Sequence, residues 1–313
     1  MIRGARSSQA ARRICCARAD GSAARKVLFL ALAFLFPAIS RSILRAVLDI
    51  IDAHAHAFPD ALASHAVNTI AGSGIWHEIN NHHDGTVRGL LASMDRAGIR
   101  RAVLCPVATK PTQVEKITNW SVSVASERII PFASIHPDYP HPEREIERMT
   151  SLGVRGLKFH PQYMDCALDD PRCLRIARLA ARARLPVAIH GGFHPAFDRR
   201  DLGSALRIRQ LHEAVPELRI IACHMGGMGD WQGVVDYLVG TEVYLETSSA
   251  PVWCPAEVWA TILARHSPER IVFGTDAPWC DQAAELASFM RLPLSPEGFE
   301  MALSKNMAAL VNA

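Results

Sequence analysis

The sequence lacks the marks of several protein classes. Its eight cysteines include no C-x-x-C pair and no compact framework, so we expect reduced, mostly buried thiols, as in a cytosolic protein. Beyond residue 46 there is no basic patch interleaved with aromatic residues, which argues against nucleic acid as a partner. With 49% hydrophobic and 21% charged residues, the chain is not disordered, collagenous or a coiled coil.

Length and charge are consistent with one mildly acidic domain. The chain has 313 residues, enough to bury a large core. It carries 34 Lys/Arg and 31 Asp/Glu, a formal net charge of +3. Nine of the basic residues and one of the acids lie in residues 1–46, so the remainder has 25 basic and 30 acidic residues, a net charge of −5.

The first 46 residues differ from the rest of the chain. Arg25 and Lys26 precede one strongly apolar run at 27–39, whose 13 residues are too few for a comfortable transmembrane helix and suit a signal-peptide core. We favour a mis-assigned start for residues 1–46 over a signal or an anchor. We therefore expect one domain at 47–313 in the cytoplasm, with export or membrane anchoring through the apolar run as the alternative.

Eight short runs rich in Val, Ile and Leu recur from residue 48 onward, and segments with helical spacing alternate with them. Continuous apolar strands that alternate with helices indicate a parallel sheet covered on both faces. Eight such units match an α/β fold of the (β/α)8 TIM-barrel type better than an open sheet. The predicted strands are 48–58, 101–108, 129–137, 154–161, 186–192, 218–227, 243–249 and 270–279.

Helical spacing, with stops at Gly or before Pro, predicts helices between these strands. Their ranges are 87–98, 143–153, 171–183, 204–215 and 257–266. The long gap at 59–86 is expected to form part of a lid or substrate loop at the barrel mouth, with a plain surface loop as the alternative. It carries His65, Trp76, His77, His82 and His83.

The segment IIDAHAHAF at 50–58 places Asp52, His54 and His56 at alternate positions with alanines between them. Side chains at i, i+2 and i+4 of a strand point to one face, so we expect the acid and both imidazoles to face together. Two imidazoles at this spacing can reach one cation. The pattern predicts part of a metal site, with two surface histidines at a strand end as the alternative.

Five other predicted strands also end in polar residues, with the sequences LKFHP, AIHGG, ACHMGGMG, LETSS and GTDAPW. In a (β/α)8 barrel the C-terminal strand ends meet at one mouth, where active-site residues lie. Six such ends predict a metal site at the C-terminal mouth.

In this order and spacing, the segments IDAHAHAF, GLKFHP, VAIHGG, IACHMGG and FGTDAPW resemble the amidohydrolase superfamily over roughly residues 48–312. The resemblance is greatest to the amidohydrolase-related branch, which also holds aminocarboxymuconate semialdehyde decarboxylase and resorcylate-type decarboxylases. It implies one divalent metal ion, with zinc expected first and manganese as the alternative. The implied ligands are His54, His56, His190 and Asp276. Asp276 would also move a proton, and His224 would act beside the ion.

Other polar residues are candidates for contact with the substrate. Lys158 and His160 share strand parity, so both are expected to point into the mouth. In some superfamily members a lysine on strand four is carbamylated and bridges two metals, but the decarboxylase-like branch uses one metal, so we expect Lys158 to bind substrate. Glu246 is either a substrate contact or a structural ion-pair partner. Three tryptophans lie near loop ends and could wall the pocket, with simple packing as the alternative for each, namely Trp76, Trp253 and Trp279.

The resemblance favours a metal-dependent hydrolase that acts on a small carboxylated or cyclic substrate. Non-oxidative decarboxylation is the main alternative, because the same constellation serves both reactions. Decarboxylase relatives often place an arginine near the mouth, and the helix position expected for Arg88 makes that role doubtful here. A non-catalytic metal-binding barrel is a third option. The expected partner is a small molecule, and assembly into a homo-oligomer is left open.

Overall fold

The computed structural model of the chain describes residues 49–75 and 78–312. The predicted leader at 1–46, with its apolar run, lies outside the described residues, as do Trp76 and His77. Within the described part of the chain, no helix is both long enough and apolar enough to span a bilayer.

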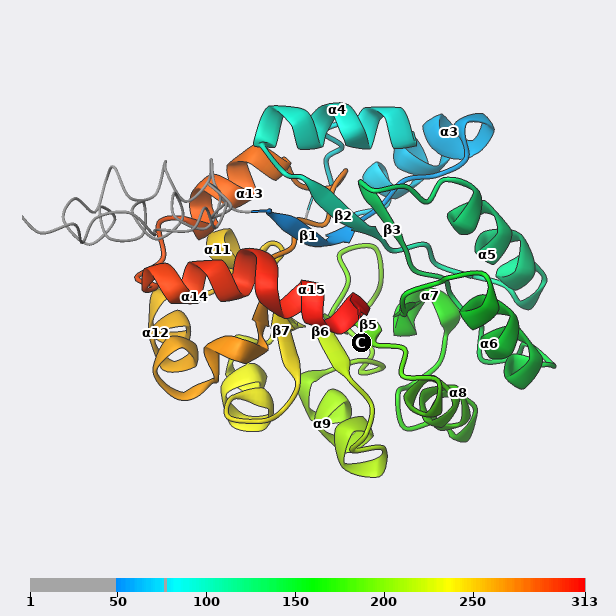
Figure 1. Cartoon of the computed structure of the whole chain (residues 1–313). Helices are drawn as coiled ribbons and strands as arrows, with labels where there is room; N and C mark the ends of the chain where they lie inside the picture. Colours follow the sequence, from blue (N-terminus) through cyan, green and yellow to red (C-terminus); the bar gives the residue numbers. More distant parts are fainter. Residues whose placement is uncertain (1–48, 76–77, 313) are drawn as a thin grey trace, which may run out of the picture. The chain divides into compact units, whose positions relative to one another are not determined.

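Eight strands follow one another along the chain, one in each predicted apolar run, with the sixth strand ending one residue beyond its run. Figure 1 shows strands near the centre with helices around them. Every strand pair is parallel, as expected when a helix connects each strand to the next. The strands are β1 Ile51–Ala55, β2 Arg101–Leu104, β3 Ile129–Pro131, β4 Leu157–Phe159, β5 Val187–Gly192, β6 Ile220–Met228, β7 Tyr244–Glu246 and β8 Ile271–Val272.

The strands pair in sequence order as a three-stranded sheet, β1 to β3, and a five-stranded sheet, β4 to β8. Isolated parallel bridges join the two sheets at both seams. Ala133, just after β3, pairs with Leu157 of β4, and Ala277, just after β8, pairs with Ala55 of β1. The backbone N–H of Ala53 also donates to the carbonyl of Phe273 at 2.8 Å. The predicted TIM-barrel order of strands is thereby confirmed.

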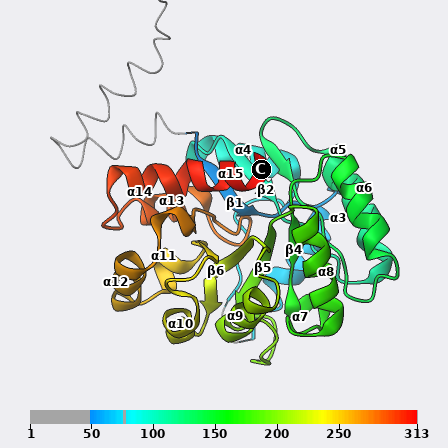
Figure 2. The same cartoon turned by 60° about the horizontal axis from the view of Figure 1, so that its bottom comes forward.

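Helices surround the strands in both views (Figures 1 and 2). The α-helices are α3 Asp60–Ala71, α4 Val87–Ala97, α5 Val114–Ser123, α6 Pro142–Ser151, α7 Pro161–Met164, α8 Pro171–Arg182, α9 Ala205–Ala214, α10 Trp231–Gly233, α11 Ala250–Trp253, α12 Ala256–Arg265, α13 Gln282–Phe289, α14 Pro296–Glu300 and α15 Asn306–Asn312. Short 3₁₀ segments are η1 Pro111–Gln113 and η3 Pro268–Arg270, and π-helical turns are η2 Val234–Leu238 and η4 Met301–Lys305.

Local signals begin and end these helices. The Thr86 hydroxyl accepts a hydrogen bond from the backbone N–H of Gly89 at 2.9 Å, which caps α4, and α4 ends at Gly98 with a left-handed φ of 73°. α8 begins at Pro171 after Asp170, whose carboxylate caps a free helical N–H. The five predicted helices agree with the observed ranges to within two residues at each end.

The interior of the barrel is apolar below the mouth. Side chains from six strands or their ends meet in one buried cluster, which also contains residues of α15. The C-terminal helix therefore packs against the inner side chains of the strands. The cluster consists of Ile51, Ala53, Val103, Cys105, Ile130, Phe132, Ala188, Ile221, Cys223, Val272, Met307, Leu310 and Val311.

A bulge in β1 changes which face its residues occupy. The register with β2 shifts between Asp52 and Ala55, so three residues of β1 span two of β2. Asp52 bonds to Thr275 and to Gln282 of α13, whereas His54 and His56 contact Asp276. The expectation that Asp52 shares a face with the two histidines is therefore wrong, because strict alternation does not survive the extra residue.

Candidate active site

Polar side chains from the C-terminal ends of β1 and β8 meet at the mouth. The Nε2 atoms of His54 and His56 lie 3.1 Å apart. Oδ1 of Asp276 lies 3.3 Å from Nε2 of His54 and 3.1 Å from Nε2 of His56. Residues separated by more than 200 positions in the sequence thus present three ligand atoms to one point.

His190 at the end of β5 and His224 in β6 lie beside this group. Nε2 of His224 is 3.2 Å from Nδ1 of His190 and 3.9 Å from Oδ2 of Asp276. Nε2 of His190 is buried and has no hydrogen-bond partner among the described residues. An unpaired buried nitrogen is costly unless a ligand or ion satisfies it, so this atom is open to one.

Glu246 of β7 orients two of these residues from below. Its Oε2 accepts from Nδ1–H of His54 at 3.0 Å and from the backbone N–H of His224 at 3.3 Å. Ser248 donates its backbone N–H and its hydroxyl to the same carboxylate at 2.6 and 2.8 Å. When Nδ1 of His54 carries the proton, Nε2 keeps a lone pair for a metal. The carboxylate of Glu246 packs directly against the backbone of residue 274, and only glycine leaves room for it there, since an added Cβ would clash with Oε1 of Glu246.

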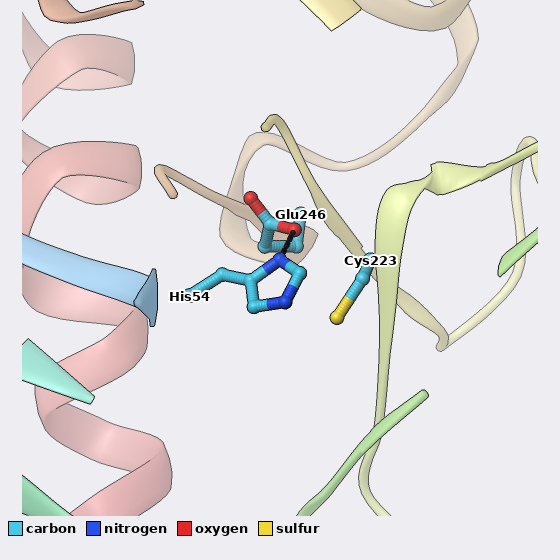
Figure 3. Close-up of side chains that lie close together, drawn as sticks. All are labelled: His54, Cys223 and Glu246. Atoms are coloured by element: carbon cyan, nitrogen blue, oxygen red, sulfur yellow. Dashed lines mark hydrogen bonds and ion pairs between the residues drawn. The ribbon is translucent and has the colours of Figure 1, made fainter. Parts of the chain in front are cut away.

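Figure 3 shows His54 with its dashed contact to Glu246 and with the thiol of Cys223 nearby. Ligand atoms of these three residues lie within 4.8 Å of one another, as do those of His54, His224 and Asp276. Glu246 and Cys223 are fully buried and do not line the cavity described below. The group containing Asp276 is therefore the one that a substrate can reach.

Burial sets the protonation of the site. It lowers the pKa of His54 and His190 far below the usual value, and that of His224 to about 4. These imidazoles are neutral near pH 7, the form that binds a metal. Burial raises the pKa of Asp276, but the hydrogen bond from His56 and the neighbouring His224 lower it more, so the carboxyl stays ionised. Burial raises the pKa of Glu246 to about 8. The hydrogen bonds from Ser248 and the positive charge of Lys158 oppose this shift and favour the ionised form, which accepts from His54.

Two residues of the site have strained backbone conformations. His224 and Asp276 have left-handed φ values of 56° and 61°, which non-glycine residues rarely adopt. Such conformations persist where surrounding contacts impose them, and they are frequent at active sites. Asp52 supplies one of these contacts, because its carboxylate accepts from the Thr275 backbone N–H at 3.0 Å and from the Thr275 hydroxyl at 2.6 Å.

The two candidates on β4 also reach the site. Nζ of Lys158 lies 2.8 Å from Nε2 of His54 and donates to Sγ of Cys223 at 3.2 Å. The ring of His160 stacks on that of His190, with centroids 4.2 Å apart and planes 11° apart. Both residues line the cavity. Their shared strand parity therefore places them where the sequence pattern predicts.

A cavity of about 510 Å³ opens above these residues. His54, His56 and Asp276 form part of its lining, together with Trp279. Apolar side chains of α3 and α5 form the opposite wall, and Lys116 of α5 also lines it. Those wall side chains are Leu62, Ile70, Ile117 and Trp120.

Sequence reasoning did not single out several residues around the site. Tyr163 and His194 line the cavity, and Ser248 bonds to Nδ1 of His224 at 2.9 Å. Ser248 could have been found, because it lies two residues after Glu246 at the same strand end. Lys116 had no such signal, since no helix was predicted at α5.

Other sequence candidates lie away from the cavity lining. Trp253 is half exposed at the end of α11, and Arg88 is exposed on α4. In the predicted excursion, His65 is exposed on α3 and His82 is exposed after it. The excursion still contributes to the mouth through the two apolar α3 residues named above.

The residues fit a divalent metal ion. Two atoms bound to one tetrahedral ion at about 2.0–2.1 Å lie about 3.3 Å apart. The separations of 3.1 to 3.3 Å among His54, His56 and Asp276 agree with this value. Neutral imidazoles with one carboxylate suit zinc and also manganese.

Comparison with known proteins identifies related sequences and folds. The model of the amidohydrolase family, Amidohydro_2, matches residues 51–312. A search of curated proteins found no match.

Solved structures share the fold at low sequence identity. An uncharacterized TIM-barrel protein from Bordetella bronchiseptica has a TM-score of 0.65 and 16% identity, covering 85% of this chain and 99% of that one. A 5-carboxyvanillate decarboxylase from Novosphingobium aromaticivorans, with bound manganese and 3-methoxy-4-hydroxy-5-nitrobenzoic acid, has a TM-score of 0.64 and 15% identity. The match covers 85% of this chain and 97% of the decarboxylase. A probable 2-pyrone-4,6-dicarboxylic acid hydrolase from Acinetobacter baumannii has a TM-score of 0.58 and 15% identity. The match covers 85% of this chain and 100% of the hydrolase.

Proposed function

This chain belongs to the amidohydrolase family, and we propose that it is a metal-dependent hydrolase of a small organic acid. The observation that carries the proposal is the position of the Asp276 carboxylate, 3.1 and 3.3 Å from the Nε2 atoms of two histidines and exposed to the cavity. A carboxylate so placed can share a cation with the imidazoles and still accept a proton.

His54, His56, His190 and Asp276 would hold one divalent ion. Zinc is our first choice for this ligand set, and the manganese bound by the similar decarboxylase keeps manganese as the alternative. The unpaired Nε2 of His190 supports its assignment as a ligand. Such an ion supplies a Lewis acid that polarises a substrate oxygen and makes water more acidic.

The protein groups divide the proton chemistry between them. The ionised Asp276 accepts a proton from the attacking water and returns it to the leaving group. His224 is neutral, and its Nδ1 contacts the Ser248 hydroxyl at 2.9 Å while that hydroxyl donates to Glu246. Its Nε2, 3.9 Å from Asp276, therefore offers a lone pair that can take up a proton there. Glu246 keeps Nδ1 of His54 protonated and so fixes the ring that binds through Nε2.

The cavity supports a substrate with an apolar body and an acidic group. Its α3 and α5 wall is apolar except for Lys116, for which no ion pair occurs among the described residues. A cation beside an apolar wall favours an anion attached to a hydrophobic body. Lys158 supplies a second cation next to the metal ligands, and Trp279 adds an aromatic surface.

Non-oxidative decarboxylation is a second candidate. It is favoured by the same two lysines, which could hold a substrate carboxylate, and by the fold shared with the carboxyvanillate decarboxylase. Arg88 offers no support for it, because this arginine does not line the cavity. The two reactions differ in their products.

The test is a product assay with defined metal content. The full chain is stripped of metal, reloaded with zinc or manganese, and offered small lactones, N-acyl compounds and hydroxybenzoates. We expect acid release that requires about one metal per chain and is lost in His56→Ala together with the metal, since losing one ligand weakens the site. Carbon dioxide release without hydrolysis would instead establish the decarboxylase, and bound metal without turnover would favour a non-catalytic barrel.

A further inference from the structure

Two cysteines outside the candidate active site lie against each other. Sγ of Cys166 is 2.6 Å from Sγ of Cys173, and both side chains are buried. No other pair of thiols among residues 49–75 and 78–312 makes such a contact. Because six residues separate the two cysteines, they form no C-x-x-C motif, and the sequence alone did not pair them.

The local fold holds both sulfurs in place. Cys166 follows α7, and its backbone N–H donates to the carbonyl of Pro161 at 3.1 Å. Cys173 lies in the first turn of α8, which begins at Pro171. A disulfide can form without backbone movement only where the two side chains already face each other, and the contact between the two sulfurs shows that the helix start and the turn before it bring them together.

We propose that Cys166 and Cys173 form a reversible disulfide that closes the segment between α7 and α8. The co-reactant is a low-molecular-weight disulfide such as oxidised glutathione. One cysteine thiolate attacks a sulfur of that disulfide and releases one thiol, and the second cysteine then attacks the mixed disulfide and releases the other. The two protein thiols lose two electrons and two protons, and the small disulfide gains them.

The position of this pair links it to the cavity. α7 begins directly after His160 and carries Tyr163, and both residues line the cavity. A covalent link after α7 reduces the freedom of the unfolded chain and of this segment, which stabilises the folded state. The pair therefore couples redox conditions to the stability of one wall of the cavity.

Peptide mapping of the full chain tests the proposal. The protein is equilibrated with mixtures of oxidised and reduced glutathione, its free thiols are alkylated, and it is digested with trypsin. Trypsin cleaves after Lys158, Arg172 and Arg175, so the disulfide would join peptide 159–172 to peptide 173–175. We expect this linked pair under oxidising conditions and its loss with dithiothreitol. Full alkylation of both cysteines in every mixture would overturn the proposal.

Stability measurements provide a second readout. Oxidation should raise the melting temperature of the unaltered chain by a few degrees but leave Cys166→Ser and Cys173→Ser unchanged. Cys254→Ser is the matched control, because Cys254 is a buried thiol that contacts no other thiol in the described chain, and this variant should still respond. A response that survives in Cys166→Ser would show that another bond is responsible. If a serine variant fails to fold, the peptide map of the unaltered chain still decides.

Discussion

The cavity has two sides that are built from different parts of the chain. The ligand side consists of residues in or just after strands, His54, His56, His190 and Asp276, and the buried His224 contacts them without lining the cavity. The wall side consists of residues on two helices outside the barrel strands, and comprises Leu62, Ile70, Lys116, Ile117 and Trp120. The strand ends present the chemistry in a fixed geometry, whereas the helices shape the space that selects a substrate.

Changing Asp276 tests the ligand side most severely. Asp276→Asn can still offer an oxygen to a metal but cannot accept a proton at neutral pH. We expect it to retain some metal and to lose turnover by at least about 100-fold, the usual scale for a general base. Steady-state rates and metal content measured on the same samples provide the test.

His224→Asn is the matched variant for this prediction. It should lower turnover with unchanged metal content, since we place His224 beside the ion. Near-normal turnover in Asp276→Asn would move the proton acceptor elsewhere, with His224 the first candidate. Loss of metal in His224→Asn would make that histidine a ligand, as the closeness of its Nε2 to Asp276 also allows.

Changing Glu246 tests whether metal binding depends on the hydrogen bond between Glu246 and His54. Its carboxylate accepts hydrogen bonds from His54, Ser248 and the backbone of His224. In Glu246→Gln an amide group must face one of these donors, which disturbs the orientation of His54. We expect metal affinity to fall by about 10- to 100-fold. Titration with a competing chelator measures the change.

Glu285→Gln is the control for Glu246→Gln. Glu285 is another buried carboxyl, but it contacts the backbone of Ser249 and does not line the cavity. Its replacement should leave metal affinity unchanged. Equal losses in the two variants would mean that general destabilisation, and not the orientation of His54, explains the effect.

Changing Lys116 tests the wall side. Lys116→Ala removes a cation that lines the cavity and leaves the ligand side intact. For an acidic substrate we expect KM to rise about three- to tenfold with little change in kcat, as for the loss of an exposed charge contact. Lys116→Arg should restore most of the affinity. Lys110→Ala, which changes an exposed lysine outside the cavity lining, should leave KM unchanged. A fall in kcat with KM unaltered would place Lys116 in the chemistry instead.

The two sides also differed in how well the sequence predicted them. The eight strands and the polar residues at their ends were predicted because buried parallel strands are continuous apolar runs and because strand ends share one mouth. Asp52 was misplaced because the β1 bulge depends on pairing with β2, which local alternation does not reveal. Glu246 was found as a polar strand end, but its position beneath the cavity depends on the packing of His54 and Gly274 around it.

The α5 part of the wall side was not predicted because its position depends on tertiary packing. Lys116, Ile117 and Trp120 lie on α5, for which no helix was expected, and only the docking of that helix beside the mouth turns them toward the cavity. The stretch that carries Leu62 and Ile70 was expected at the barrel mouth, where both residues line the cavity, but it was expected to be a loop and it folds as α3.

The smallest expected effect is a pH dependence of the free energy of unfolding that comes from Glu285. This buried acid is protonated in the folded protein, whereas Asp276 at the candidate active site is ionised. Burial raises the pKa of Glu285 to about 8, and its carboxyl accepts from the backbone N–H of Ser249 at 3.1 Å. The folded state therefore holds a proton that the unfolded chain releases above its ordinary pKa of about 4.5. Folding is most favoured by this group below that pH, and its contribution is lost as pH rises toward 8.

Glu285→Gln has no proton to release, so its stability should not carry this decline. We expect the free energy of unfolding of the unaltered chain, relative to the variant, to fall between pH 5 and pH 9 by an amount on the order of a few kcal/mol. Urea unfolding of both proteins at the two pH values measures it. Turnover should not change, because Glu285 does not line the cavity. If the difference in stability between the unaltered chain and Glu285→Gln did not depend on pH, Glu285 would already be ionised in the folded protein. Glu285 and Asp276 would then have the same protonation state.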